Sequence, residues 1–291
     1  MKPQIITQSL VASYLTRRPK DSHKGMFGTV VVIGGASGMT GAALLAGRAA
    51  LKTGAGCVHV GLLAEGSPAV DLVQPELMLH KAADALKLPH ITVLAAGCGM
   101  GTSTAAHDLL HDALNNDIPL VLDADALNLL AIHPELPSRL IARSAATILT
   151  PHPGEAARLL CCNGAEIQND RIAAVHQLAE KFGCPVVLKG ANSLCSTRDG
   201  LFVNPTGNPG MSGPGMGDVL TGMIAAFIAQ GLTADRALLL AVYLHGAAGD
   251  ELAKQTAVGM TATELTEAAR SLLNQWASER QSHKQTIETN N

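Results

Sequence analysis

Short apolar runs alternate with amphipathic stretches along most of the chain. Residues 29–33 (TVVVI) predict a buried strand, and the small-residue stretch 41–53 predicts a helix after it. Further strands are expected at 58–63, 76–80, 91–96, 119–122, 145–149 and 185–188, and helices at 105–115 and 171–182. Because continuous apolar strands that alternate with helices are typical of α/β proteins, we expect a mostly parallel central sheet with helices on both faces.

The pattern changes in the last third of the chain. Residues 194–196 and 201–203, joined through Asp199-Gly200, predict a β-hairpin. The stretches 217–230, 234–254 and 262–278 then predict helices, the last of them with a capping box at Thr261-x-x-Glu264. No linker rich in proline, glycine or serine divides the chain, so we expect a single domain over 1–278 and a polar, frayed tail over 279–291.

Composition excludes several classes of function. The 291 residues include 21 Lys and Arg against 24 Asp and Glu, and only 1 Trp, 2 Tyr and 4 Phe. This balance argues against a nucleic-acid partner, which needs basic and aromatic surfaces. No apolar run approaches the ~18 residues of a membrane helix, so no membrane association is expected. The N-terminus lacks a secretory signal and the six cysteines form no CxxC pair, so we expect a reduced, cytoplasmic protein.

Ligands of parallel sheets bind beyond the carboxyl ends of the strands, and glycine-rich loops follow two of the predicted strands. The loop 34–42 (GGASGMTGA) opens a helix and suits an anion, although its glycines also fit tight strand-to-helix packing. It matches neither a P-loop nor a dinucleotide fingerprint. The loop 97–101 (GCGMG) allows a ligand to approach the backbone, or forms an ordinary tight turn.

Three strand ends carry polar side chains. Asp123 and Asp125 hold a metal or cap a helix, and capping is the commoner use of such acids. In the loop 150–155 (TPHPGE), His152 and Glu155 are candidates for polar chemistry, but Glu155 also fits the first turn of a helix. Lys189 ends a strand and is followed by glycine, which suits phosphate contact, whereas the alternative is a lysine that extends to the surface.

The strongest signal is the segment 210–220 (GMSGPGMGDVL). Glycines crowd into the start of a predicted helix and place Asp218 in its first turn. Backbone N–H groups at such a helix start stabilise the charge that develops on a transferring phosphoryl group. Asp218 beside them is a candidate base for an attacking hydroxyl, and the alternative is an acid that only complements the helix dipole.

The Gly-x-Gly-Asp helix start resembles the ribokinase-like kinases, and the whole set of motifs most resembles the ADP-dependent NAD(P)H-hydrate dehydratases of that superfamily. The matching segments, in the family's order, are KGMFGTVVVIGGASGMTGAA, 75–78, DADALNLL, TPHPGE, VVLKGA, NPTGNPG, MGDVLTG and YLHGAAGD. They cover the chain from Lys24 to Asp250. The epimerase domain that often precedes this one in the family is not expected here.

The resemblance implies a ribokinase-like fold and assigns roles to particular residues. The hydrated dinucleotide would contact Ala42, Gly99, Gly101, His152 and Asp218. The adenine nucleotide would contact Lys189, Gly190, Ala191, Asn192, Ser193 and Gly217. His152-x-x-Glu155 stands where related kinases use Asn-x-x-Glu to organise magnesium. No residue is assigned as a metal ligand from the sequence.

The implied reaction is repair of NADH or NADPH hydrate, with ADP as phosphoryl donor and Mg²⁺ as cofactor. Asp218 would deprotonate the ring hydroxyl, the hydroxyl would be phosphorylated, and phosphate would be eliminated, with release of AMP. The resemblance also implies a homo-oligomer, with a tetramer as one option, and a separate epimerase that acts on the same substrate. The alternatives are a small-alcohol or vitamin-precursor kinase of the same fold and a nucleotide-binding regulatory module without turnover.

Two segments depart from the family's pattern. The loop 97–101 usually reads Gly-Pro-Gly-Leu-Gly, and this chain has Cys98 and Met100 there. Ahead of Gly215 the family usually has a small residue, then Thr or Ser, then Gly or Ala, and this chain has Ser212-Gly213-Pro214. Proline has no N–H to donate, so the anion site at the helix start is expected to depend on Gly215, Met216 and Gly217. Pro214→Gly is then expected to change stability little and to improve catalysis modestly, because it restores a donor.

Overall fold

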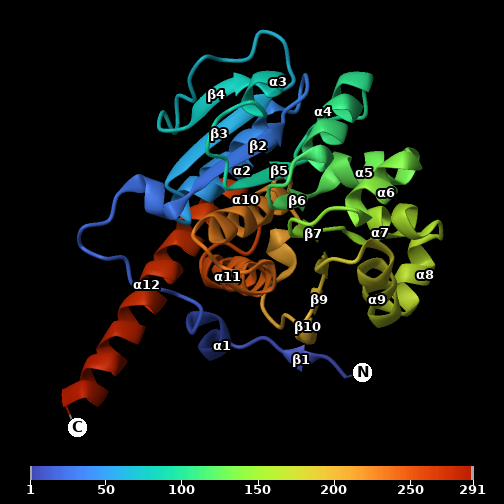
Figure 1. The fold of residues 1–291 in the computed structure, drawn as a ribbon. Helices are drawn as coiled ribbons and strands as arrows, with labels where there is room; N and C mark the ends of the chain where they lie inside the picture. Colours follow the sequence, from blue (N-terminus) through green and yellow to red (C-terminus); the bar gives the residue numbers. More distant parts are fainter. Residues whose placement is uncertain (1, 290–291) are drawn as a thin grey trace.

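The computed structural model describes residues 2–289, and its strands form one mixed sheet (Figure 1). The order across it is β1-β10-β9-β8-β7-β6-β5-β2-β3-β4. The strands are β1 (Gln4–Ile5), β2 (Thr29–Gly34), β3 (Cys57–Leu62), β4 (Met78–Lys81), β5 (Val93–Ala96), β6 (Leu120–Leu122), β7 (Thr147–Leu149), β8 (Val186–Leu188), β9 (Leu194–Thr197) and β10 (Gly200–Val203). Of these described strands, only β9 runs antiparallel to its neighbours, so the expected parallel sheet and the hairpin at Asp199-Gly200 are both confirmed.

Helices connect most of the strands. They are α1 (Gln8–Ala12), α2 (Thr40–Lys52), α3 (Ala82–Ala85), α4 (Thr104–Asn115), α5 (Ala124–Ile132), α6 (Glu135–Ile141), α7 (Pro153–Leu160), α8 (Gly164–Asn169), α9 (Arg171–Phe182), α10 (Met216–Ala229), α11 (Ala234–Ala253) and α12 (Ala262–Thr289). All the predicted helices are present. The pattern did not reveal α5 to α8, because these are short and α5 (ADALNLLAI) is apolar on most sides.

Both faces of the sheet are covered, as expected. Along β2, Val30 and Val32 pack into one buried cluster and Val31 and Ile33 into the other. The first cluster contains the apolar sides of α2, α10, α11 and α12. The second contains those of α3 to α9. This alternation explains why β2 reads as a continuous apolar run, since a strand between two helical layers has no polar face.

The C-terminal helix is longer than predicted. α12 continues past Ser278 to Thr289, and Figure 1 shows it projecting from the body of the molecule. The segment 279–289 is polar but contains no proline or glycine that would end a helix. The frayed tail expected from Glu279 onward is therefore helical as far as the structure describes it, and residues 290–291 lie outside the described part. No helix within residues 2–289 is long and apolar enough to cross a membrane.

Candidate active site

Four loops meet where parallel strands β5 to β8 end. Gly97 follows β5, Asp123 follows β6, Thr150 follows β7 and Lys189 follows β8. Helix α10 begins at the same edge and adds Asp218. The loops singled out in the sequence therefore converge, as the carboxyl ends of parallel strands must.

Asp123 is the centre of this cluster. Its carboxylate is 1% exposed; Oδ1 accepts from Lys189 Nζ (2.6 Å) and Thr150 Oγ1 (2.7 Å), and Oδ2 accepts from Thr221 Oγ1 (3.0 Å). Burial alone would raise the pKa of Asp123, but the Lys189 charge and the three hydrogen bonds hold it below the ordinary value. Asp123 stands at the N-cap of α5 without a capping bond, so the expectation that it caps a helix is wrong.

Asp125 has a different role. Its Oδ2 accepts from the backbone N–H of Gly101 (2.8 Å), and its Oδ1 accepts from Asn128 Nδ2 (3.2 Å). The first turn of α5 thereby holds the loop 97–101 in place.

Lys189 points inward rather than to the surface. Its side chain is 19% exposed, and Nζ lies 3.9 Å from Glu155 Oε2 as well as next to Asp123. Burial lowers the pKa of Lys189, but the two carboxylates outweigh burial and raise it. The ammonium therefore stays charged inside the site, where it is available to attract phosphate.

His152 and Glu155 form a capping box at the start of α7. The His152 N–H donates to Glu155 Oε2 (2.7 Å), and Nδ1 of His152 accepts from the Gly154 N–H (2.9 Å). Nε2 lies 3.2 Å from Glu155 Oε1. Burial raises the pKa of Glu155 to about 7, and burial together with Lys189 lowers that of His152. Glu155 therefore lies in the first turn of α7, as one of the two alternatives predicted. Its carboxyl also faces Lys189.

Asp218 is the third residue of α10. Burial and the nearby Asp123 charge raise the pKa of its carboxyl to about 7. The buried Cys98 thiol hydrogen-bonds to this carboxyl and partly opposes that rise. A group whose pKa lies near neutrality serves well as a general base. The departure at Cys98 therefore places a thiol directly against the candidate base.

Glycines allow the start of α10 to approach the cluster. A Cβ at Gly217 would lie 3.2 Å from Lys189 Nζ and 3.4 Å from Asp123 Oδ2, tighter than most side-chain contacts. Gly215 caps the helix with φ +87°, a conformation that favours glycine. Met216 is held by His245, whose Nε2 donates to its carbonyl (2.8 Å). Burial lowers the pKa of His245 to about 4, so this imidazole is neutral.

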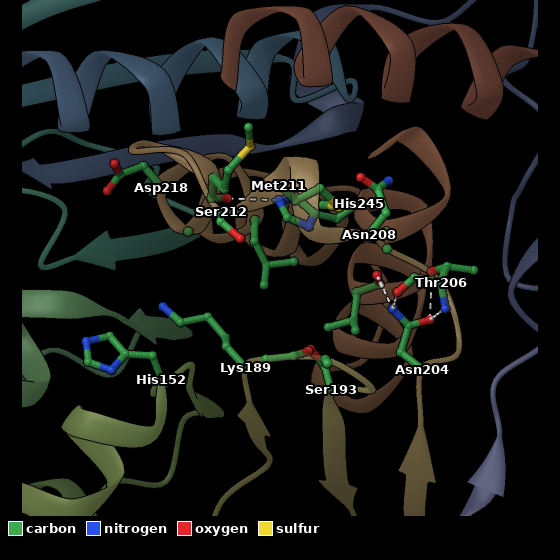
Figure 2. Close-up of a pocket in the computed structure, with 18 of the residues that line it drawn as sticks. His152, Lys189, Ser193, Asn204, Thr206, Asn208, Met211, Ser212, Asp218 and His245 are labelled. Carbon is green, nitrogen blue, oxygen red and sulfur yellow. Dashed lines mark hydrogen bonds between the residues drawn. The ribbon is translucent and has the colours of Figure 1, made fainter. Parts of the chain in front are cut away.

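A cavity of about 700 Å³ extends from this cluster. Figure 2 shows His152, Lys189 and Asp218 toward one end, and Asn204, Thr206 and Asn208 toward the other. The acid–base groups therefore lie toward one end of the lining, and amide and hydroxyl side chains lie toward the other.

Most of the expected nucleotide-binding residues line this cavity. Lys189, Gly190, Ala191, Ser193 and Gly217 do so. His152 and Asp218, which were expected to contact the dinucleotide, line the same cavity. Asn192 lies in the same turn, at φ +52°, but is not among the lining residues.

The other expected dinucleotide-binding residues, Ala42, Gly99 and Gly101, are not among the residues that line this cavity. A Cβ at Gly99 would lie 3.0 Å from that of Ala42, and one at Gly101 would lie 3.6 Å from that of Ala36. Cys98 connects this region to Asp218. The loop 34–42 packs directly on the loop 97–101, with the Gly35 N–H donating to the Cys98 carbonyl (3.0 Å).

Sequence reasoning missed the far end of the cavity. Asn204 is 3% exposed and donates to the Val242 carbonyl (3.1 Å), and Thr206 Oγ1 donates to the Tyr243 carbonyl (3.2 Å). These bonds dock the turn after β10 onto α11. A Cβ at Gly246 would collide with Thr206, so glycine is required there. The motifs NPTGNPG and YLHGAAGD were the available signal, but no residue in them was given a role.

Pro214 offers a prediction about where the anion site begins. It is exposed and lies outside the cavity lining, which resumes at Met216. The modest gain expected from sequence is therefore revised: Pro214→Gly should leave kcat and the nucleotide Kd unchanged, because position 214 does not line the cavity. Because proline restricts the unfolded chain, its loss should lower the free energy of unfolding by only ~0.4–1 kcal/mol. Enzyme kinetics and urea unfolding beside the parent protein test this; a clear gain in kcat would move the anion site back to position 214.

Comparisons with known proteins find similar sequences over most of the chain. A family model described as NAD(P)H-hydrate dehydratase matches residues 30–271. The ADP-dependent (S)-NAD(P)H-hydrate dehydratase of Neisseria meningitidis is 44% identical over 264 residues, which are 88% of this chain and 88% of that protein. The bifunctional NAD(P)H-hydrate repair enzyme Nnr of Coxiella burnetii is 44% identical over 266 residues, 89% of this chain. This chain spans about half of that longer relative, 53%.

A solved structure extends the likeness to three dimensions. The ADP/ATP-dependent NAD(P)H-hydrate dehydratase of Bacillus subtilis, co-crystallised with ATP/Mg²⁺, superposes with a TM-score of 0.82 at 29% identity, covering 95% of this chain and 99% of that one. The expected ribokinase-like fold is therefore confirmed. With a family model that matches most of its length and relatives at this level of identity, the chain belongs to the NAD(P)H-hydrate dehydratase family.

Proposed function

We propose that this protein catalyses the ADP-dependent dehydration of NADH hydrate or NADPH hydrate back to NAD(P)H, with release of AMP and phosphate. One observation carries the proposal: Asp218, whose pKa is raised to about 7, stands at the start of α10 in the cavity that Lys189 also lines. Family membership supports the choice of substrate. The site residues by themselves support phosphoryl transfer and do not identify the substrate.

The reaction proceeds through a phosphorylated ring. Asp218 accepts the proton of the ring hydroxyl as the hydroxyl oxygen bonds to the terminal phosphorus of ADP. The bond from that phosphorus to the bridging oxygen breaks, and AMP leaves. The ring nitrogen's lone pair then expels phosphate from the neighbouring carbon. Loss of a proton from the next ring carbon restores the double bond, so the net change is loss of water from the substrate and hydrolysis of ADP.

Groups of this chain stabilise the charge that develops on phosphorus. The first N–H groups of α10 have no partner within the helix, and the helix dipole favours anions there. Lys189 adds a full positive charge beside them. Asp123 orients that ammonium through the 2.6 Å contact, so it acts on the reaction through Lys189.

The residues present fit a magnesium ion that enters with the nucleotide. Mg²⁺ is usually held by one or two carboxylates together with substrate phosphates. Glu155 offers such a carboxylate; it is 4% exposed, its pKa is raised to about 7, and a cation would favour its ionised form. A bound Mg²⁺ would neutralise phosphate charge. Co-crystallisation of the Bacillus subtilis relative with ATP/Mg²⁺ supports this cofactor.

In this proposal the two substrates meet at Asp218. The hydrated dinucleotide lies toward Ala42, Gly99, Gly101 and His152. The adenine nucleotide lies along the turn 189–193 and Gly217. The cavity lining supports the second assignment, and the contact of Cys98 with Asp218 supports the first.

The proposal is tested by return of NADH absorbance. NADH hydrate is incubated with ADP and Mg²⁺, and absorbance should rise only when ADP and the protein are both present. An unchanged spectrum with a fully folded protein would reject the function.

ADP is expected to be the better donor, on the strength of the resemblance and the name of the Neisseria relative. The check is kcat/KM for ADP and for ATP with NADH hydrate under equal Mg²⁺. A preference for ATP of tenfold or more would contradict the expectation and favour a kinase of the same fold.

We also propose a homo-oligomeric protein in a reducing, cytoplasmic compartment, with an epimerase acting on the same substrate. The six cysteines, all of them free, support the compartment. Leu72 (91% exposed) and Val73 (67%) precede edge strand β4 and support a subunit interface. The bifunctional relatives support the epimerase. Light scattering of the purified protein tests the oligomer, and a monomer would reject it.

A further inference from the structure

A second group of potential ligands lies on the outer helical layer, away from the cavity. It comprises His107, His133 and Glu135, whose nearest ligand atoms all lie within 4.8 Å of one another. None of the three lines the cavity that holds Asp218. The group is therefore separate from the proposed active site.

Three neighbouring elements bring these side chains together. His107 lies in the first turn of α4, His133 is the C-cap of α5, and Glu135 is the first residue of α6. The ring centroids of the two histidines are 4.4 Å apart. Because Pro134 separates His133 from Glu135, the turn between α5 and α6 has little freedom to move these two residues apart.

The distances suit one metal ion. Glu135 Oε1 lies 2.9 Å from His107 Nε2 and 3.8 Å from His133 Nδ1. Zinc bonds to imidazole nitrogen and carboxylate oxygen are about 2.0–2.2 Å, which separates tetrahedral ligand atoms by about 3.3–3.5 Å. The two observed separations lie on either side of that value, and the two histidine nitrogens lie within 4.8 Å of each other.

A second observation points to a cation at the same place. The other ring nitrogen of His107, Nδ1, donates to Asp108 Oδ1 (3.0 Å). Metal-binding histidines are commonly oriented by a carboxylate on the nitrogen that does not bind the metal. With Nδ1 donating to Asp108, a neutral imidazole carries its lone pair on Nε2, the nitrogen that lies 2.9 Å from Glu135 Oε1.

We propose that His107, His133 and Glu135 bind one zinc ion, or a divalent transition-metal ion of similar preference, with Asp108 orienting His107. Two imidazoles and one carboxylate are a zinc ligand set, and water completes the fourth position. The exposed position of Glu135 leaves that fourth position accessible. The ion would tie α4 to the turn between α5 and α6. α4 follows the loop 97–101, so the bound ion would also stiffen one side of the active site.

The test is calorimetric titration of the chelator-treated full chain with zinc chloride, without nucleotide or magnesium. We expect one ion per chain. His107→Ala and His133→Ala should each weaken binding at least ~10-fold, and Asp108→Asn ~10–100-fold, as for other residues that orient metal ligands. His176→Ala, an exposed histidine on α9, should bind zinc as the parent does. Circular dichroism checks that each variant is folded, and Glu135→Gln replaces any variant that is not.

Two results would overturn the proposal. One is a parent protein that binds no zinc. The other is zinc binding that the histidine variants leave intact and that Asp218→Asn removes, because the ion would then occupy Cys98, Asp123 and Asp218. Both readouts are independent of dehydratase activity, so failure here and failure of the proposed function are distinguishable.

Discussion

Asp218→Asn is expected to lower kcat by about 10²–10⁴-fold and to leave the nucleotide Kd close to that of the parent. Asparagine has nearly the same shape and still accepts the Cys98 hydrogen bond, but it takes no proton from a hydroxyl. Stability at neutral pH should not fall, because the substitution removes a buried carboxylate whose ionised form is disfavoured by burial. Steady-state kinetics, nucleotide titration and urea unfolding measure the three effects.

The pH dependence gives an independent check on Asp218. Its pKa is raised to about 7, so the basic form is lost as pH falls through that value. In the parent protein, kcat should therefore fall below about pH 7, and this limb should be absent from the residual activity of Asp218→Asn. Asp84→Asn, an exposed acid on α3, is the matched control and should behave as the parent. A kcat like that of the parent in Asp218→Asn would remove this residue from the mechanism.

Lys189→Met is expected to destabilise the fold by about 3–5 kcal/mol, the usual cost of leaving one partner of a buried ion pair uncompensated. The substitution leaves the Asp123 carboxylate without its cation at 1% exposure. Activity should also be lost, since no charge remains to face the phosphates. Urea unfolding followed by circular dichroism gives the stability, with Lys87→Met, an exposed lysine, as control.

Two further results follow from the same pair. Without Lys189, only the Thr150 and Thr221 hydrogen bonds oppose the effect of burial, so the pKa of Asp123 rises and the carboxyl takes up a proton more readily. The stability difference from the parent should therefore shrink as pH falls from 8 to 5. Asp123→Asn added to Lys189→Met should recover part of the loss, because no buried charge remains. Equal stability of Lys189→Met and Lys87→Met would show that the pair is not a structural unit.

Elements with a strong hydrophobic period could be predicted from sequence, and weakly patterned ones could not. β2 and the hairpin β9–β10 were recognisable from their apolar runs and from Asp199-Gly200. α5 could not be recognised, because seven of its nine residues are apolar and a helix packed on several sides has no polar face. β1 has two residues, too few to carry a pattern.

The functional residues of the site also differ in whether the sequence predicts their roles. Asp218 and Lys189 were recognisable from local context, namely the glycine-rich helix start and the strand end. The role of Asp123 was not, because Thr150, Lys189 and Thr221 reach it from distant parts of the chain. A local rule for acids before helices predicted a cap, and the buried lysine competed successfully for the same carboxylate.

The most direct test of ADP-dependent dehydration is the stoichiometry of one reaction with NADH hydrate and ADP. NADH, AMP and phosphate are quantified at several times from the same tube. The three products should appear in equal amounts, with no stable phosphorylated dinucleotide. AMP formed together with a persistent phosphorylated product, and no NADH, would contradict dehydration and indicate a kinase.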